Sequence, residues 1–279
     1  MPKINLGTLY VVSTPIGNLE DITVRALDSL KTVDYILCED TRITKRLLVK
    51  YNIESKLISF NEKNEHNRIS KVIDDLNNNF NIALVSDAGT PCISDPGYRL
   101  ISHIKKNNLD FNVLPLPGPS AAISALSVSG LPSDSFYFVG FLPKKKGRQK
   151  KINQIKEIDS SIILYEAPYR INKTLSDLYL YLGDRKIFIA REMTKKHETY
   201  IRQSIEKLTT FKTQLRGELT IVISKKIKKK LLTTDYVKIE KQVIKYLKSY
   251  TVKDVVELMS KKEKVSKKII YKLCIKNKK

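Results

Sequence analysis

The sequence ALVSDAGTP, at Ala83–Pro91, is a short apolar run that passes directly into a loop of small and turn-forming residues. Two other stretches have the same character: LYVVSTPIGN at Leu9–Asn18 and VLPLPGPS at Val113–Ser120. In α/β proteins such loops lie together at the carboxyl ends of parallel strands, where backbone amides are exposed and ligands bind. Tight turns alone would have a similar composition. We expect an α/β fold with its active site at this edge.

Outward from these stretches, strand-like and helix-like segments alternate from Gly7 to Pro115. This alternation predicts a parallel sheet with helices on both faces, in a first domain that covers residues 1–116. We expect strands at residues 9–13, 35–39, 57–60, 82–86 and 111–114 and helices at residues 23–30, 42–49, 67–76 and 97–105.

A second α/β domain is expected at residues 117–226, because the proline-rich segment Pro115–Pro119 precedes a helix that opens at Ser120. Its later strands follow one another without long helices, which favours a mixed sheet. We expect its strands at residues 136–140, 161–166, 186–191, 199–204 and 218–224 and its helices at residues 148–157 and 170–182.

A small, basic, helical segment is expected at residues 233–279, after the linker Lys225–Lys230. Thr251 and Ser266 are suitable caps for two short helices that would resemble a helix-turn-helix, although a simple helical cap has the same pattern.

The net charge of +22 has two interpretations. A polyanionic partner would select for it, but an AT-rich gene would also produce the excess of 40 lysines over 11 arginines. The charge is concentrated in residues 225–279, where 19 lysines face 5 acidic residues, a difference of +14. This concentration favours a local basic surface.

No feature of the sequence points to a membrane, a metal or a disulfide framework. The longest apolar stretch, Ser120–Leu131, is too short to span a bilayer, and no signal segment opens the chain, so we expect a cytoplasmic protein. Cys38, Cys92 and Cys274 are far apart and odd in number. The glycine loops match no common phosphate-binding motif, and we expect them to hold a small, largely uncharged ligand.

Several further motifs occur in order along the chain. They are TPIGNLEDIT at Thr14–Thr23, CEDTR at Cys38–Arg42, SDPG at Ser94–Gly97, LPGPSA at Leu116–Ala121, GLPSD at Gly130–Asp134, GFLP at Gly140–Pro143, YEAP at Tyr165–Pro168, AREMTK at Ala190–Lys195 and GE at Gly217–Glu218. With ALVSDAGTP, this series resembles the tetrapyrrole methylase family, and within it the enzymes that methylate the 2′-hydroxyl of a cytidine in the decoding centre of 16S rRNA.

The resemblance implies a class III methyltransferase fold, a homodimer, and S-adenosylmethionine bound in the cleft between the two α/β domains. No metal is implied. The small ribosomal subunit, through its 16S rRNA, would be the partner. Matched residue by residue, the family's cofactor contacts fall on Pro15, Asp87, Gly89, Thr90, Ser120, Ala121, Leu142, Tyr165, Gly217, Glu218 and Leu219.

A ribose hydroxyl is a poor nucleophile until its proton is accepted, so the reaction needs a base or an orienting group. The candidates for catalytic roles are Glu39, Asp40, Glu62, Glu65 and Glu166, with Arg191 and Lys195 positioning phosphate. The sequence does not rank them. Members of the family often have histidine where this chain has Lys63 and Tyr169, so a histidine base at either place is excluded.

A dense basic run follows GFLP and is a candidate for binding the RNA backbone, although a solvated loop would look the same. Its cations are Lys144, Lys145, Lys146, Arg148, Lys150 and Lys151. Two other functions share parts of this pattern. A methylase of a tetrapyrrole such as a cobalamin precursor would use the same fold, and a non-catalytic ribosome-assembly protein could retain it. The basic loop and tail favour RNA.

Overall fold

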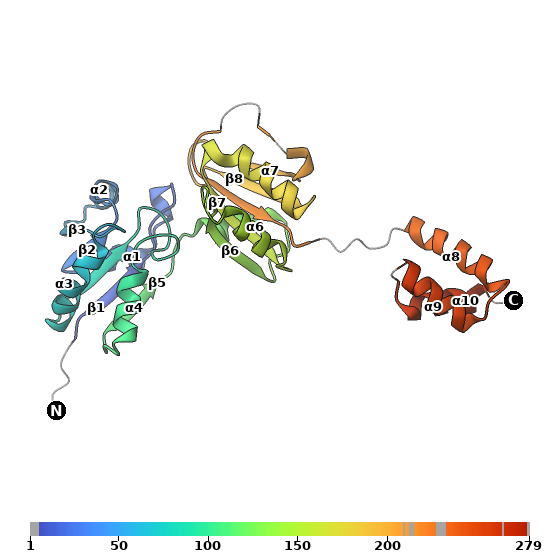
Figure 1. Ribbon diagram of the computed structural model, residues 1–279. Coiled ribbons are helices and arrows are strands. Elements are labelled where there is room, and N and C mark those ends of the chain that lie inside the picture. The colour runs from blue at the N-terminus through green and yellow to red at the C-terminus, as the bar shows by residue number, and fades with distance from the viewer. Residues whose placement is uncertain (1–5, 209, 212–214, 227–232, 264, 278–279) are drawn as a thin grey trace. The chain divides into compact units, whose positions relative to one another are not determined.

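The computed structural model describes residues 6–208, 210–211, 215–226, 233–263 and 265–277 (Figure 1). The chain forms two compact units, Met1–Lys226 and Ile227–Lys279. The first unit contains two five-stranded sheets, and the second contains helices alone among its described residues.

The first sheet is parallel throughout, as the alternating pattern predicted. Its spatial order is β3-β2-β4-β1-β5, which places the carboxyl ends of β1, β4 and β5 side by side. The strands are β1 (Thr8–Val12), β2 (Tyr35–Cys38), β3 (Leu57–Ser59), β4 (Ile82–Val85) and β5 (Asn112–Leu116). Strands β1 and β4 are adjacent and parallel, so the loops that follow these two strands are neighbours.

Alternate residues of each central strand enter different cores. In β4, Leu84 packs with helices α3 (Glu65–Asn77) and α4 (Tyr98–Lys106), whereas Val85 packs with helices α1 (Val24–Thr32) and α2 (Thr41–Lys50). Burial on both faces explains why these strands read as continuous apolar runs instead of alternating with polar residues.

The last strand of this sheet is longer than the sequence pattern indicated. We expected it to end at Leu114, before the prolines, but β5 includes Pro115 and ends at Leu116. Proline is tolerated there because β5 is an edge strand, which among the described strands pairs only with β1. The strand therefore carries the chain directly to the loop before Ser120.

The second sheet is mixed, as expected, with the order β6-β7-β10-β8-β9. Only β6 and β7 are parallel, and the other neighbours are antiparallel. Helices α6 (Arg148–Lys156) and α7 (Ile171–Leu182) pack on one face, and α5 (Ala121–Ser129) packs on the other. The strands are β6 (Phe136–Phe141), β7 (Ser161–Glu166), β8 (Lys186–Arg191), β9 (Thr199–Ser204) and β10 (Leu219–Ile223).

The second unit consists of α8 (Thr233–Leu247), α9 (Val252–Glu263) and α10 (Lys267–Asn277). Its own core includes Val243 from α8, Met259 from α9 and Cys274 from α10. The hydroxyl of Thr251 accepts a hydrogen bond from the amide of Asp254, 3.3 Å away, and so caps α9 as the sequence indicated. Among the described helices, none has the length and apolar character needed to cross a membrane.

Candidate active site

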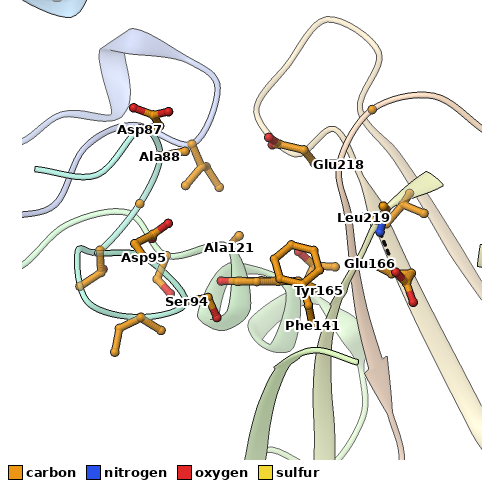
Figure 2. Close-up of a pocket in the computed structure, with 18 of the residues that line it drawn as sticks. Asp87, Ala88, Ser94, Asp95, Ala121, Phe141, Tyr165, Glu166, Glu218 and Leu219 are labelled. Atoms are coloured by element: carbon orange, nitrogen blue, oxygen red, sulfur yellow. Dashed lines mark hydrogen bonds between the residues drawn. The ribbon is translucent and has the colours of Figure 1, made fainter. Parts of the chain in front are cut away.

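A pocket of about 560 Å³ opens where the loops of the first sheet meet residues of the second sheet, a volume typical of small-molecule sites. In Figure 2, Asp87 and Asp95 lie on one side of it, and Tyr165, Glu218 and Leu219 lie on the other. The lining residues are Ile16, Glu39, Asp87, Ala88, Gly89, Thr90, Ile93, Ser94, Asp95, Ser120, Ala121, Phe141, Tyr165, Glu166, Ala167, Pro168, Gly217, Glu218, Leu219 and Thr220.

The three loops that follow β1, β4 and β5 are joined by hydrogen bonds beneath this pocket. Thr14 and Gly89 exchange two backbone hydrogen bonds, of 2.8 and 3.0 Å. The hydroxyl of Ser13 lies 3.1 Å from that of Thr90, which donates in turn to the carbonyl of Pro119 at 3.2 Å. These contacts give the pocket a preorganised floor.

Gly89 has a φ of +84°, in the region that side chains disfavour. A β-carbon at this position would lie 3.4 Å from the side chain of Ile16, an ordinary contact distance. The need for glycine therefore comes mainly from the backbone conformation and not from a lack of space.

The pocket is strongly acidic. It is lined by Glu39, Asp87, Asp95, Glu166 and Glu218, and by no lysine, arginine or histidine among the described residues. The loops therefore differ from the sequence expectation of a site for a largely uncharged ligand. Carboxylates gathered at one site favour a cationic ligand.

Asp95 has the largest pKa change in this group. Burial, followed by the negative charges of Glu39 and Asp87, raises its pKa from 3.8 to about 7. Burial also raises the pKa of Glu39, to which the charge of Asp87 adds. A cluster of carboxyl groups with raised pKa values in a pocket is a functional-site signature.

The loop that carries Asp95 is held from below by Glu65. The buried carboxylate of Glu65 accepts a hydrogen bond from the amide of Gly97 at 3.3 Å and pairs with Arg99 at 3.2 Å. Glu65 does not line the pocket, so its expected catalytic role is wrong in this structure: its carboxylate supports the Asp95 loop instead.

The carboxylate of Asp40 also has a structural role. Its carboxylate caps α2 by accepting from the amide of Arg42 at 2.9 Å, and it pairs with the Arg42 guanidinium. Hydrogen bonds from Arg42 lower the pKa of Asp40 to about 2, which makes it a weak base. The backbone amide of Asp40 donates to Asp87 at 3.0 Å and so orients that pocket carboxylate.

Glu166 lines the pocket, but its carboxylate is turned to partners inside the second domain. It pairs with Arg170 at 3.1 Å and accepts a hydrogen bond from the hydroxyl of Thr174. Arg170 also donates to the carbonyl of Leu142. Leu142 is itself buried in the core beside α7 and does not line the pocket, so this network supports the wall from behind.

The loop that carries Gly217 and Glu218 is braced by two basic residues. Arg191 donates to the carbonyl of Arg216 at 2.7 Å, and Lys195 pairs with Glu218 at 2.9 Å. Both cations are therefore engaged within the second domain. Their proposed contact with phosphate has no support in this geometry.

The basic run contains one residue of a different kind. Lys144, Lys145, Lys146 and Lys150 are exposed, but Arg148 is buried. Its guanidinium pairs with Asp177 at 2.7 Å and donates to Thr174 at 2.7 Å. The expectation that Arg148 binds RNA is therefore corrected, because its charge is used to join α6 to α7.

Of the expected cofactor contacts, all but Pro15 and Leu142 line the pocket, where Ile16 lies in place of Pro15. Their contact with a cofactor stays a prediction. Glu39 is the expected catalytic residue whose carboxyl group remains in the pocket without an ion pair among the described residues. Sequence reasoning missed Asp95, Ile93 and Phe141. The SDPG motif was the available signal for Asp95.

The model of the tetrapyrrole (corrin/porphyrin) methylases matches residues 8–209, which extend from β1 past β9. The chain belongs to the tetrapyrrole methylase family. It is therefore a methyltransferase on an α/β fold, as the motif series indicated.

Its relatives include proteins named ribosomal RNA small subunit methyltransferase I. The one from Thermotoga maritima is 46% identical over 79% of this chain and 100% of the relative. The one from Halalkalibacterium halodurans is 46% identical over 78% of this chain and 75% of the relative. The one from Bacillus subtilis is 46% identical over 79% of this chain and 76% of the relative.

Solved structures share the fold of the methylase at low sequence identity. Uroporphyrin-III C-methyltransferase from Thermus thermophilus, complexed with S-adenosylhomocysteine, has a TM-score of 0.56 at 15% identity, over 78% of this chain and 97% of that one. Diphthine synthase has a TM-score of 0.60 at 14% identity, over 78% of this chain and 90% of diphthine synthase.

Proposed function

We propose that this methyltransferase transfers a methyl group from S-adenosylmethionine to the 2′-hydroxyl of a cytidine in the decoding centre of 16S rRNA. The observation that carries the proposal is a pocket in which the carboxyl groups of Glu39, Asp87 and Asp95 have no ion-pair partner among the described residues, in a chain whose net charge is +22. The acidic pocket suits the cationic methyl donor, and the basic surface outside it suits the RNA. Relatives at 46% identity carry the corresponding name.

The pocket suits S-adenosylmethionine in its charge and its volume. This cofactor supplies a methyl group on a positively charged sulfur and also carries an ammonium group, both of which carboxylates stabilise. Asp87 and Asp95 lie on one wall, and Glu218 lies on the other. The rings of Phe141 and Tyr165, with centroids 5.7 Å apart, provide an apolar surface of the kind that heterocycles contact.

The protein's main task in this reaction is to align the methyl group with the acceptor oxygen. The bridged loops at Thr14 and Gly89 are suited to that task because they are rigid. We assign to Glu39 the acceptance of the proton from the ribose hydroxyl. Its raised pKa makes it a stronger base than an ordinary carboxylate, and it lines the pocket.

A tetrapyrrole acid is a weaker candidate for the acceptor. Its carboxylate substituents would meet the carboxyl groups of Glu39, Asp87 and Asp95, which have no ion-pair partner among the described residues, and no basic residue among those that line the pocket. Relatives at 41–46% identity are named ribosomal RNA small subunit methyltransferase I, whereas uroporphyrin-III C-methyltransferases share 14–16%. A non-catalytic ribosome-assembly protein would not need an acidic pocket for a cationic ligand.

The direct test is methyl transfer from labelled S-adenosylmethionine to purified small subunits that lack the modification, followed by mass-spectrometric mapping of ribose methylation. We expect one methylated cytidine in the decoding centre and no product with uroporphyrinogen. Label in uroporphyrinogen alone would refute the RNA assignment, and label in neither would refute both.

The exposed lysines of the basic run are proposed to bind the RNA backbone. Replacing Lys144, Lys145, Lys146 and Lys150 by glutamine should weaken binding to small subunits about tenfold, because each phosphate contact releases counterions. The salt dependence should become less steep by up to about 3 units of slope. Filter binding at several salt concentrations measures both effects, and calorimetry should show unchanged cofactor affinity.

A matched control for this variant neutralises four exposed lysines elsewhere in the first unit. Lys31, Lys50, Lys105 and Lys106 are suitable, since they lie on α1, α2 and α4. The control should retain the wild-type salt slope. An equal loss of RNA binding in both variants would show that only net charge matters.

The proposal includes a homodimer in the cytoplasm, where ribosomal subunits are modified. Helix α5 has no charged residue and exposes Ile123 and Val128, and the neighbouring edge strand exposes Leu114. Exposed apolar groups of this kind often mark contacts between subunits. Sedimentation equilibrium should give twice the chain mass, and a monomer at micromolar concentration would exclude this part of the proposal.

A further inference from the structure

Helix α10 belongs to the C-terminal unit (Figure 1). It exposes both basic and apolar side chains. Lys268, Tyr271, Lys272 and Ile275 are all exposed, with exposed fractions of 53% for Tyr271 and 50% for Ile275. Their spacing of three, four and seven residues places them on one side of the helix. The opposite side, with Ile270 and Cys274, enters the core of the unit. We call these four residues the α10 face.

The charge on this face is not neutralised. Helix α10 contains no acidic residue, whereas α9 contains Asp254, Glu257 and Glu263. The lysines at the two ends of α10 have partners: Lys267 pairs with Glu257 at 3.4 Å, and Lys276 pairs with Glu240 at 3.0 Å. Lys268 and Lys272 have no ion-pair partner in the part of the chain that the structure describes.

The apolar groups on the same face also lack a cover. The ring of Tyr271, which lies between the two lysines, and the side chain of Ile275, one turn after Tyr271, expose apolar surface without contributing to the core. No described residue of the unit packs over them, because the buried and half-buried residues of this core come from the other side of α10. The combination of unpaired ammonium groups and an exposed ring is suited to a partner that is anionic and has flat apolar groups.

Nucleic acid has this combination of phosphates and stacking surfaces. We infer that the α10 face is a second RNA-binding surface, with Lys268 and Lys272 on phosphates and Tyr271 stacked on an unpaired base of the ribosomal RNA. This inference rests on the proposed function. Only residues 264–266 separate α9 from α10, so the face lies on the second helix of a helix-turn-helix-like pair, the position that commonly contacts nucleic acid.

The two lysines lie one helical turn apart, about 6 Å along the axis, so both can reach the backbone of a single strand. RNA is read mainly at unpaired bases that stack on aromatic side chains, which gives Tyr271 a role that a lysine could not fill. The pocket in the first unit would then act on a nucleotide, while the α10 face contacts another part of the same RNA.

The test uses the full-length protein and small subunits that lack the modification. The variant K268E/K272E should weaken binding at least fivefold and reduce the salt slope by about 1.5, since two phosphate contacts are lost. The variant Y271A should weaken binding about fivefold or more with an unchanged salt slope, because stacking is not electrostatic. Helix content by circular dichroism and the thermal midpoint should stay at wild-type values in both variants.

The matched control is K253E/K261E, which makes the same change of charge on exposed positions of α9. It should lose less than twofold in affinity. Equal losses in the α9 and α10 variants, or none in either, would overturn the inference while wild-type binding and methylation still support the proposed function. Failure of the wild-type protein to bind or methylate rRNA would instead refute the proposed function. A change in oligomeric mass with normal RNA affinity would make the α10 face a protein contact.

Discussion

Gly89→Val is expected to weaken the binding of S-adenosylmethionine about 100-fold. A β-branched residue at a φ of +84° is strained by about 1–3 kcal/mol, and the loop can relieve this strain by moving. Such a movement would break the two backbone hydrogen bonds to Thr14 and displace Asp87 and Thr90 from the pocket. Isothermal titration calorimetry measures the affinity directly, and methyl transfer at low cofactor concentration should fall in parallel.

The matched control is Gly130→Val. Gly130 has a similar φ of +71° at the end of α5 and lies outside the pocket, and a β-carbon added there would meet open space among the described residues. This variant should lose a comparable amount of stability but bind the cofactor normally. Normal affinity in Gly89→Val would remove the loop after β4 from the cofactor site, and a loss in both variants would attribute the effect to destabilisation.

Asp95→Asn is expected to weaken S-adenosylmethionine binding roughly 30-fold at pH 8, which corresponds to about 2 kcal/mol for the loss of one charged partner. At pH 6 the difference should shrink to about threefold, because a carboxyl group with a pKa of about 7 is then mostly protonated in the wild-type protein as well. Wild-type affinity should therefore rise with pH between 6 and 8. Calorimetry across this range gives both curves.

Two controls isolate the charge of Asp95. S-adenosylhomocysteine lacks the positive charge on sulfur, so its affinity should vary less with pH. Asp110→Asn changes an exposed carboxylate outside the pocket and should leave the wild-type pH profile intact. A pH-independent affinity in the wild-type protein, or an unchanged profile in Asp95→Asn, would exclude Asp95 from recognition of the cationic cofactor.

The same residue should affect the stability of the cofactor-free protein in the opposite direction. The folded-state pKa of Asp95 lies above its ordinary value of 3.8, so its contribution to stability is present at low pH and is lost as the pH rises toward 7. Asp95→Asn should consequently be more stable than the wild-type protein at pH 8. Urea unfolding of both proteins at pH 5 and pH 8 tests whether Asp95→Asn raises the free energy of unfolding at the higher pH. A carboxylate stabilised by an ion pair would give the opposite result, because its loss would lower the free energy of unfolding.

Much of the fold followed from local pattern. Alternating apolar segments and helix signals in the first domain predicted a parallel sheet because burial on both faces requires long apolar runs such as Ile82–Val85. The edge strand was the exception: the proline at position 115 indicated the end of a strand. It is accommodated within β5 because this strand has a single neighbour, β1, in the part of the chain that the structure describes. Strand position within a sheet is a tertiary property.

The candidate site divides in the same way. The backbone conformation of a loop depends on its own residues, so Gly89 and the other loop residues were recognisable from the sequence. The roles of charged side chains depend on neighbours that are distant in sequence. Lys144 and Arg148 belong to one basic run, yet Arg148 is buried against Asp177 and Thr174 of α7 while Lys144 is exposed.

The sequence by itself determined the α/β class, the order of the elements and the loops that form the pocket, because these depend on residue pattern and backbone conformation over short distances. Only the tertiary structure decided which carboxylates act together. Asp95 comes close enough to Glu39 for its charge to raise the pKa of Asp95, although Glu39 follows β2 whereas Asp95, like Asp87, follows β4. Electrostatic interactions depend on distance and burial in space, which no short stretch of sequence specifies.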